Sequence, residues 1–195
     1  MNLPRVEAAE QNKRVIYDII RSHLDGDALE IGSGTGQHAV YFAAQSPRIS
    51  WQTSDLVDGL PGIAARIRAS GLANLPAPIE LDVLGEWPRR QYDFAFTANS
   101  FHIMSRDMVA GCMAGIGACL KPGGVFAVYG PFNYGGEYTA DSNAAFDRML
   151  QLRDPASGIK NFEWLAELAG AAGLDLLDDV EMPVNNRILL WQKRT

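Results

Sequence analysis

The stretch that decides the fold is Leu29–Val40, LEIGSGTGQHAV, in which three glycines alternate with small polar residues. The residues before the glycines, 27–31, are typical of a short strand, and residues 36–45 are typical of a helix. Glycine allows the left-handed turns and the close backbone approach that a ligand-binding loop needs. We therefore predict a loop that holds a phosphate, a dinucleotide or a nucleoside without phosphate.

Outside this loop, the hydrophobic pattern predicts alternating strands and helices. Residues 7–24 form an amphipathic helix, with the apolar side chains on one stripe and the charges opposite. Five strands, interleaved with helices, are predicted to end near Ile31, Asp55, Asp82, Asn99 and Gly130. Alternation of this kind indicates a parallel sheet with helices on both faces.

The C-terminal part departs from this alternation in two places. Residues 131–160 are polar and aromatic, with one helical stretch near residues 142–152, and they follow the carboxyl end of a strand, where open α/β sheets bind ligands. The last two strands, 174–182 and 186–193, are separated by little more than PVNN. A parallel connection needs roughly a dozen residues or more, so we predict that the sheet ends in an antiparallel hairpin.

Composition limits the class of protein. The 195 residues predict a single domain, 1–195, with the N-terminal helix and an insertion at about 131–160, and no metal site is predicted. The net charge of −6 would repel a nucleic-acid backbone. A polar N-terminus and the lack of an apolar run of roughly 20 residues predict a cytoplasmic protein with no membrane partner. Cys112 and Cys119 are expected to be small buried hydrophobes.

Two familiar phosphate-binding motifs do not fit the glycine loop. A P-loop requires lysine after its last glycine, and Gln37 follows Gly36 here. A dinucleotide fingerprint counted from Gly32 requires its third glycine at position 37, which is again Gln37. The spacing is instead G-x-G-x-G, with Glu30 two residues before it. An NAD-dependent oxidoreductase is therefore the least favoured alternative.

The segment Glu30–Gly36 resembles the first motif of the S-adenosylmethionine-dependent methyltransferases with a Rossmann-like fold. Further features of that superfamily agree with it: Asp55, Asp82-Val83, FTANSFHIM at Phe96–Met104 and LKPGG at Leu120–Gly124. The resemblance implies an α/β fold with a Rossmann-like, doubly wound sheet of seven strands, mostly parallel with an antiparallel C-terminal strand and helices on both faces. It also implies S-adenosyl-L-methionine as the cofactor.

The resemblance also assigns cofactor contacts. In the superfamily the glycine loop lies under the methionine and ribose parts of the cofactor, an acid after the second strand accepts the ribose hydroxyls, and an acid after the third strand meets the adenine amino group. These expectations fall on Glu30, Gly32, Ser33, Gly34, Thr35, Gly36, Asp55, Leu56, Asp82, Val83 and Asn99. Asn12 and Arg14 would join them if the first helix folds over the site, with Arg14 facing the cofactor carboxylate.

A narrower resemblance rests on other segments. GPFNYGGEYTADSNAAFDRML, RDPASGI and EMPVNN, together with Asn12-Lys13-Arg14, are similar to a family of short methyltransferase-like proteins whose activity is not assigned. This resemblance implies the fold and the cofactor more than the substrate.

We expect the acceptor of the methyl group to be a small molecule. The chain lacks the Asn-Pro-Pro-Tyr/Phe motif and the Pro-Cys pair of enzymes that methylate nucleic-acid bases. His102 is the expected acid–base residue, or else a structural histidine. Residues 131–145 of the inserted segment are expected to form a lid in which Tyr134 and Asn143 contact the acceptor. The alternative from another class is a non-catalytic S-adenosylmethionine-binding protein, acting as a sensor or a partner subunit.

Overall fold

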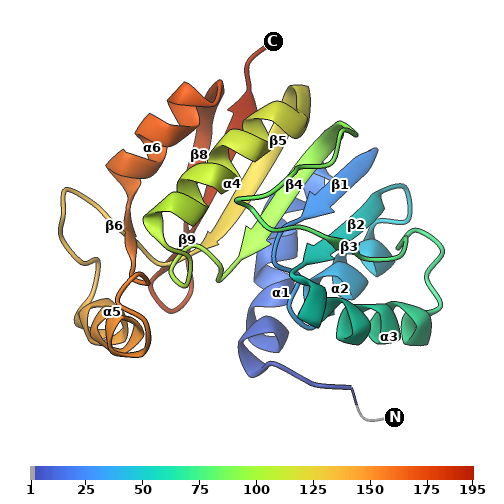
Figure 1. Ribbon diagram of the computed structural model, residues 1–195, viewed down its shortest axis with the longest axis horizontal. Coiled ribbons are helices and arrows are strands. Elements are labelled where there is room, and N and C mark those ends of the chain that lie inside the picture. The colour runs from blue at the N-terminus through green and yellow to red at the C-terminus, as the bar shows by residue number, and fades with distance from the viewer. Residues whose placement is uncertain (1–2) are drawn as a thin grey trace.

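The structure, a computed structural model, describes residues 3–195 and is built around a seven-stranded sheet (Figure 1). The strand order is β3-β2-β1-β4-β5-β9-β8. In chain order, the strands of this sheet are β1 (Asp27–Glu30), β2 (Ser50–Asp55), β3 (Ile79–Glu80), β4 (Tyr92–Ala98), β5 (Leu120–Gly130), β8 (Leu174–Met182) and β9 (Asn186–Lys193). The order reverses between β1 and β4, which creates the crevice where such sheets bind ligands.

Within this sheet, β9 runs against the other strands. It pairs antiparallel with β5 on one side and with β8 on the other, whereas β1 to β5 pair in parallel. Three residues connect Met182 to Asn186, and two of them, Val184 and Asn185, have left-handed backbone angles of φ 60° and 56°. Such angles match a tight hairpin turn. The predicted mostly parallel sheet with an antiparallel C-terminal strand is confirmed.

Helices cover both faces of the sheet, as the alternation predicted (Figure 1). One face carries α1 (Glu7–Ile20), α2 (Gln37–Gln45) and α3 (Leu60–Ser70), and the other carries α4 (Arg106–Cys119) and α6 (Phe162–Ala171). On β4, Phe94 and Phe96 pack toward α1–α3, while Ala95 between them belongs to the core under α4 and α6. Because side chains of a strand point to opposite faces, one sheet supports two cores.

Two elements differ from their predicted lengths. The first helix, expected over residues 7–24, ends at Ile20 and continues as a 3-10 turn through His23. The third strand, expected over residues 77–83, keeps only Ile79–Glu80. It lies at the edge of the sheet and follows Pro76 and Pro78, which lack the N–H groups that a strand ladder needs. The residues expected at the end of this strand therefore lie in the loop after it.

Residues 131–160 form a small unit near the carboxyl edge of the sheet (Figure 1). β6 (Phe132–Asn133) pairs in parallel with β7 (Lys160–Asn161), and α5 (Asp141–Arg153) lies between them in sequence, where a helix was predicted. The buried carboxylate of Asp147 accepts hydrogen bonds from the Tyr138 hydroxyl at 2.7 Å and from the Ile159 N–H at 2.6 Å. These bonds join the two sides of the unit.

Lys160 fastens this unit to the loop after β4. Its buried Nζ donates to the carbonyl oxygens of Met104 and Gly158, each at 2.7 Å. The Gly158 N–H in turn donates to the carbonyl oxygen of His102 at 2.9 Å. Burial lowers the pKa of Lys160 to about 8. The loop that carries His102 is therefore held in place by the inserted unit.

The two cysteines are buried in the core of the protein. Cys112 and Cys119 are buried on α4, and burial raises the pKa of both thiols, so they act as packing residues. Within residues 3–195, no helix combines the length and the apolarity needed to cross a membrane.

Candidate functional site

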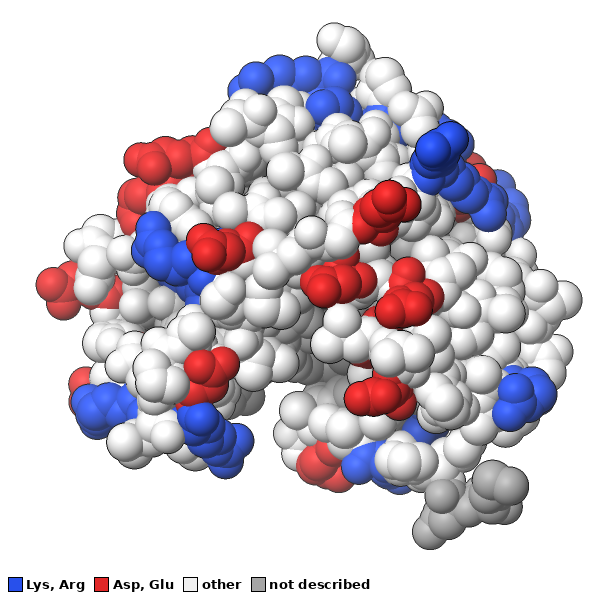
Figure 2. Space-filling view, viewed as in Figure 1, with Lys and Arg blue, Asp and Glu red and all other residues white. Residues whose placement is uncertain are grey.

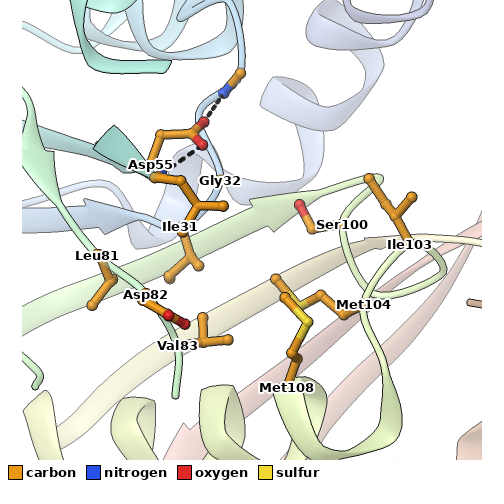
Figure 3. A pocket seen from close by; sticks show the side chains of 12 residues that line it. Ile31, Gly32, Asp55, Leu81, Asp82, Val83, Ser100, Ile103, Met104 and Met108 are labelled. Atoms are coloured by element: carbon orange, nitrogen blue, oxygen red, sulfur yellow. Dashed lines mark hydrogen bonds between the residues drawn. The ribbon is translucent and has the colours of Figure 1, made fainter. Parts of the chain in front are cut away.

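A cavity of about 330 Å³ lies at the carboxyl ends of β1 to β4, beside the glycine loop (Figure 3). We call it the glycine-loop cavity. It is lined by Ile31, Gly32, Gly34, Asp55, Leu56, Leu81, Asp82, Val83, Ser100, Ile103, Met104 and Met108. The structure thus brings together these residues expected to bind the cofactor: Gly32, Gly34, Asp55, Leu56, Asp82 and Val83.

The glycine loop presents bare backbone to this cavity. Gly32 and Gly34 have φ angles of 65° and 55°, which glycine adopts without strain. A Cβ on Gly34 would meet no atom within 4 Å, whereas a Cβ on Gly32 would come within 3.1 Å of Ser100 Oγ. Gly36, also left-handed, caps the start of α2 and does not line the cavity. The loop leaves open space against its backbone for a ligand.

Glu30 is buried under the loop and supports it. Its Oε2 accepts hydrogen bonds from Ser33 Oγ at 2.9 Å and from Trp51 Nε1 at 3.1 Å, and its carbonyl oxygen accepts one from Ser54 Oγ at 2.6 Å. Burial, with a smaller effect of the Asp55 charge, raises the pKa of Glu30 to about 7. Glu30 and Ser33 shape the loop without lining the cavity.

Asp55, at the end of β2, faces the glycine loop. Its Oδ2 accepts a hydrogen bond from the Gly34 N–H at 2.7 Å, and its Oδ1 accepts one from the Leu56 N–H at 2.8 Å (dashed lines in Figure 3). The side chain is half-buried and lines the cavity. A carboxylate at this point of an α/β sheet can accept hydrogen bonds from ribose hydroxyls.

The remaining wall of the glycine-loop cavity is largely apolar. Leu81 and Val83 are buried on one side, and Met104 and Met108 lie on the other (Figure 3). Asp82 is exposed at the rim, where its Oδ1 accepts a hydrogen bond from a backbone N–H two residues on, at 3.0 Å. An apolar slot with a carboxylate at its rim suits a planar base that carries an amino group.

Gln37 joins the N-terminal segment to the glycine loop. Its Oε1 accepts hydrogen bonds from the Val6 N–H at 2.7 Å and from Thr35 Oγ1 at 2.8 Å. Its Nε2 donates to Glu10 Oε1 at 2.7 Å. Gln37, the residue that departs from the dinucleotide pattern, therefore holds the start of α1 beside the glycine loop. Thr35 supports this arrangement through its hydrogen bond to Gln37.

Two further cavities adjoin the loop after β4. The α5 cavity, of about 440 Å³, is lined by Val6, Ala8, Asn99, His102, Pro131, Ser142, Asn143, Phe146, Val184 and Asn186. The α1 cavity, of about 180 Å³, is lined by Ala8, Gln11, Asn12, Val15, Asn99, Tyr129, Pro183, Val184 and Asn186. Figure 2 shows a hollow in the surface between α5 and the part of the molecule that contains α1, α2 and α3. Residues that line the α5 cavity lie there.

Asn99 stands where these cavities meet. It lines the α5 and α1 cavities, and its neighbour Ser100 lines the glycine-loop cavity. Its φ angle of 57° is uncommon outside glycine, and its N–H donates to the Tyr129 carbonyl oxygen at 2.9 Å. A ligand in the glycine-loop cavity and a ligand in the α5 cavity would be neighbours at this loop.

His102 is buried and lines the α5 cavity. Its ring meets the Phe146 ring edge-on, with 5.2 Å between the centroids. Burial, and to a lesser extent the Lys160 charge, lowers the pKa of His102 to about 4, so its imidazole is neutral at pH 7. The ring is therefore in the form that can accept a proton.

The two residues expected from α1 have different positions. Asn12 is buried and lines the α1 cavity, and its Oδ1 accepts a hydrogen bond from His38 Nε2 at 2.7 Å. Burial lowers the pKa of His38 to about 4, so that ring is neutral as well. Arg14 is exposed and lines none of the three cavities. The exposed position of Arg14 on α1 does not support the contact expected with the cofactor carboxylate.

Tyr134, expected to contact an acceptor, lies elsewhere. Its hydroxyl donates to Asp179 Oδ2 on β8 at 2.8 Å, and its ring stacks on Phe162 of α6 with 5.3 Å between the centroids. Neither partner lines the α5 cavity. Stacking and a hydrogen bond hold Tyr134 against the sheet edge, and Tyr134 is not among the residues that line the α5 cavity. Asn143 does line the α5 cavity.

Several lining residues were not anticipated from the sequence. In the glycine-loop cavity they include Ser100, Ile103, Met104 and Met108, and in the α5 cavity Val6, Phe146, Val184 and Asn186. Three segments singled out from the sequence contain most of them, so membership in these segments was the available signal: Ser100, Ile103 and Met104 lie in FTANSFHIM, Phe146 in GPFNYGGEYTADSNAAFDRML, and Val184 and Asn186 in EMPVNN. Nothing local marks Val6, which reaches the cavity through the tertiary contact with Gln37.

A family model matches almost the whole chain. Residues 4–193 match the family described as "Protein of unknown function (DUF938)". The chain belongs to the DUF938 family. The narrower resemblance, to short methyltransferase-like proteins without an assigned activity, is thereby confirmed for this DUF938 chain.

Several solved methyltransferase structures have the same fold as this chain. An O-methyltransferase family protein from Burkholderia thailandensis matches with a TM-score of 0.86 at 15% identity, over 96% of this chain and 57% of that chain. A putative O-methyltransferase from Nostoc punctiforme matches with a TM-score of 0.84 at 16% identity, over 95% of this chain and 56% of that chain. Human N-acetylserotonin methyltransferase in complex with SAM matches with a TM-score of 0.79 at 15% identity, over 97% of this chain and 53% of that chain. The DUF938 chain therefore has the Rossmann-like methyltransferase fold and spans little more than half the length of these proteins.

Proposed function

We propose that the chain is an S-adenosylmethionine-dependent methyltransferase that acts on a small molecule. The observation that carries the proposal is the loop at Asn99–Ser100, on whose two sides the glycine-loop cavity and the α5 cavity lie. Transfer of a group between two bound molecules requires that both be held next to each other. The methyltransferase fold of the solved structures supports the proposal.

The glycine-loop cavity fits this cofactor. Gly34 leaves open space against the backbone, Asp55 offers two carboxylate oxygens, and the wall at Leu81 and Val83 is apolar with Asp82 at its rim. Ribose hydroxyls and an adenine ring with its amino group require these kinds of partner. When bound, S-adenosylmethionine would supply a methyl group on a positively charged sulfur that departs as a neutral thioether.

The residues of the α5 cavity would position the acceptor and hold its proton. The neutral imidazole of His102 can accept a proton at a ring nitrogen from an acceptor bound in this cavity. With a pKa of about 4 it is a weak base. Positioning of the acceptor beside the glycine-loop cavity would therefore contribute more to the rate than proton transfer does.

The size and charge of the site favour a small acceptor. A volume of about 440 Å³ lies within the range of small-molecule pockets, roughly 300–1,000 Å³. Acidic and basic side chains are interspersed on the face shown in Figure 2, without a broad basic surface there for a nucleic acid.

Calorimetric titration and a product assay test this function. S-adenosylmethionine and S-adenosylhomocysteine are expected to bind, and NAD is not. Release of S-adenosylhomocysteine from S-adenosylmethionine is then measured across a library of metabolites. Binding of NAD without binding of either sulfur nucleoside would overturn the proposal. Cofactor binding without release for any metabolite would favour a non-catalytic binding protein.

A further inference from the structure

Non-glycine residues with left-handed backbone angles gather beside the α5 cavity and the adjoining α1 cavity. Among residues 3–195, the non-glycine residues with left-handed φ angles are Asn99, Val184 and Asn185, at 57°, 60° and 56°. Asn99 and Val184 line the α5 cavity. The carbonyl oxygen of Asn185 accepts a hydrogen bond at 3.2 Å from Asn143 Nδ2, and Asn143 lines the same cavity. Such residues cluster where a binding site requires a particular side chain.

Val184 is the most unusual of the three. Asparagine tolerates left-handed angles, but a β-branched side chain rarely adopts them. Hairpin turns of this type favour asparagine or glycine at such positions. The residue Val184 is also 85% exposed, so core packing does not explain its backbone angle. A ligand in the α5 cavity would cover this side chain and bury its apolar surface.

The α5 cavity carries no charge at neutral pH. Within the described residues, its lining includes no lysine, arginine, aspartate or glutamate. Its one titratable lining group, His102, is neutral because burial lowers its pKa to about 4. A charged ligand would lose water here without gaining an opposite charge, which is costly. The cavity therefore disfavours carboxylates, phosphates and ammonium groups.

The cavity does offer hydrogen-bond acceptors. Asn143 Nδ2 donates to the Asn185 carbonyl oxygen, and Asn186 Nδ2 donates to the Val184 carbonyl oxygen, both at 3.2 Å. These bonds set the orientation of both amides, because a flip would place two carbonyl oxygens against each other. Among residues 3–195 no hydrogen bond to the Oδ1 of Asn143 or of Asn186 is found, so each Oδ1 can accept one. A matching ligand carries O–H or N–H donors.

We infer that the acceptor is an uncharged molecule that combines an apolar body with hydroxyl or N–H donors, and that Val184 is a specificity-determining residue that packs on the apolar body. Phenols and hydroxylated heterocycles have this chemistry. The inference rests on the proposed function in naming this ligand the acceptor of the methyl group.

The first experiment varies the charge of the ligand. The probes are 4-hydroxybenzamide, 4-hydroxybenzoate and 4-hydroxybenzylamine, extended to two-ring and three-ring phenols in the same three charge states. Each is titrated calorimetrically into the protein with and without saturating S-adenosylhomocysteine. We expect the uncharged members to bind at least about tenfold more tightly than their charged partners. Tighter binding of a charged member, or no binding of any uncharged member, would overturn the inference.

The second experiment compares Val184→Gly with the matched control Asn185→Gly. Both changes place glycine at a left-handed position of the same turn, so neither should lower Tm. Val184→Gly should weaken the Kd of the best uncharged probe about tenfold, because it removes an apolar contact. Asn185→Gly, which keeps the backbone carbonyl and does not line the cavity, should change that Kd less than about twofold. An unchanged Kd in Val184→Gly, or equal losses in both variants, would overturn the role of Val184.

These experiments separate the inference from the proposed function. If uncharged probes bind but S-adenosylhomocysteine does not, the methyltransferase proposal fails, and the inferred preference of the α5 cavity for uncharged ligands is supported. If S-adenosylhomocysteine binds and charged probes are preferred, the methyltransferase proposal stands and the inference fails.

Discussion

The carboxylate of Asp55 accepts a hydrogen bond of 2.7 Å from the backbone N–H of Gly34, which ties the end of β2 to the loop after β1. The other carboxylate oxygen accepts one from the Leu56 N–H at 2.8 Å. Both oxygens are therefore oriented before any ligand binds. Groups that are already oriented lose less conformational freedom on binding, so this carboxylate is preorganised for a ligand with hydroxyl groups.

Asp55→Ala should weaken the binding of S-adenosylhomocysteine by about 1–3 kcal/mol, because ribose hydroxyls would lose a charged acceptor. Calorimetry measures the change. The matched control is Asp58→Ala, which removes an exposed carboxylate from the adjacent 3-10 turn outside the cavity and should leave the affinity unchanged. Equal affinities for Asp55→Ala and the wild type would mean that Asp55 has only a structural role.

His102→Ala should spare cofactor affinity and lower turnover of the acceptor by roughly 10²–10⁴ if the imidazole accepts the proton. His23→Ala is the control, since His23 ends the 3-10 turn after α1 and lines none of the three cavities. Steady-state kinetics with a fixed acceptor would report kcat and KM separately. A rate within about twofold of the wild type would exclude proton transfer to His102.

The pH dependence of that rate follows from the low pKa of His102. The neutral ring is the active form and predominates above its folded-state pKa of about 4. The rate should therefore stay level from about pH 8 down to about pH 5 and fall at lower pH. Circular dichroism at each pH identifies the range in which the protein stays folded. A fall centred near pH 6.5, the ordinary histidine value, would show that the ring is not desolvated.

Glu30→Gln tests the buried carboxyl under the glycine loop. Its folded-state pKa of about 7 lies above the ordinary value of 4.5, so the folded protein keeps a proton that the unfolded chain releases. The stability that this proton adds is present below about pH 4.5 and is lost as the pH rises through about 7. The shift corresponds to about 3 kcal/mol.

Denaturant unfolding at about pH 5 and pH 8 measures that effect. The wild type should lose stability relative to Glu30→Gln as the pH rises, and the buried histidines cancel because both proteins contain them. A difference between the two proteins that is the same at both pH values would contradict the raised pKa of Glu30.

Gln37→Ala should release the N-terminal segment from the glycine loop. Because Gln37 Oε1 accepts from the Val6 N–H at 2.7 Å, that amide should exchange with deuterium faster in the variant. Gln45→Ala, at the exposed end of the same helix, is the control and should leave the Val6 amide unchanged. Identical exchange at Val6 in all three proteins would show that the contact does not form in solution.

The expected lid can now be confined to a shorter segment. Tyr134 is held by Asp179 at one end and Asn143 by the Asn185 carbonyl at the other. Between them, the N–H groups of Gly135 and Glu137 donate to Glu163 Oε1 at 2.8 Å and to the Tyr134 carbonyl oxygen at 2.9 Å, so the shorter segment is residues 138–140. We expect these amides to exchange faster than those of β4 and β5 in the free protein, and more slowly with S-adenosylhomocysteine and an acceptor bound. Protection equal to that of the central strands in the free protein would show a fixed wall.

The sheet and the cofactor side of the site could be predicted from local patterns in the sequence. Strand ends at Asp55 and Asn99 could be located because hydrophobic periodicity is a property of neighbouring residues. The three-residue connection from Met182 to Asn186 permits only an antiparallel pairing, so it specified the terminal hairpin. Asp55 and Asp82 were expected beside the glycine loop because the resemblance to the methyltransferase superfamily implies acids after the second and third strands, and because the carboxyl ends of parallel strands meet at one edge of a sheet.

The acceptor side depended on tertiary structure. Val6, Asn143 and Val184 line one cavity although they lie in three distant segments, and no local pattern encodes that meeting. Tyr134 and Arg14 had suitable chemistry, but side-chain direction is decided by packing partners, which turn Tyr134 to Asp179 and leave Arg14 in solvent. The spacing of residues along the chain therefore specified which strands and loops form, whereas the packing of those elements decided which side chains face the α5 cavity.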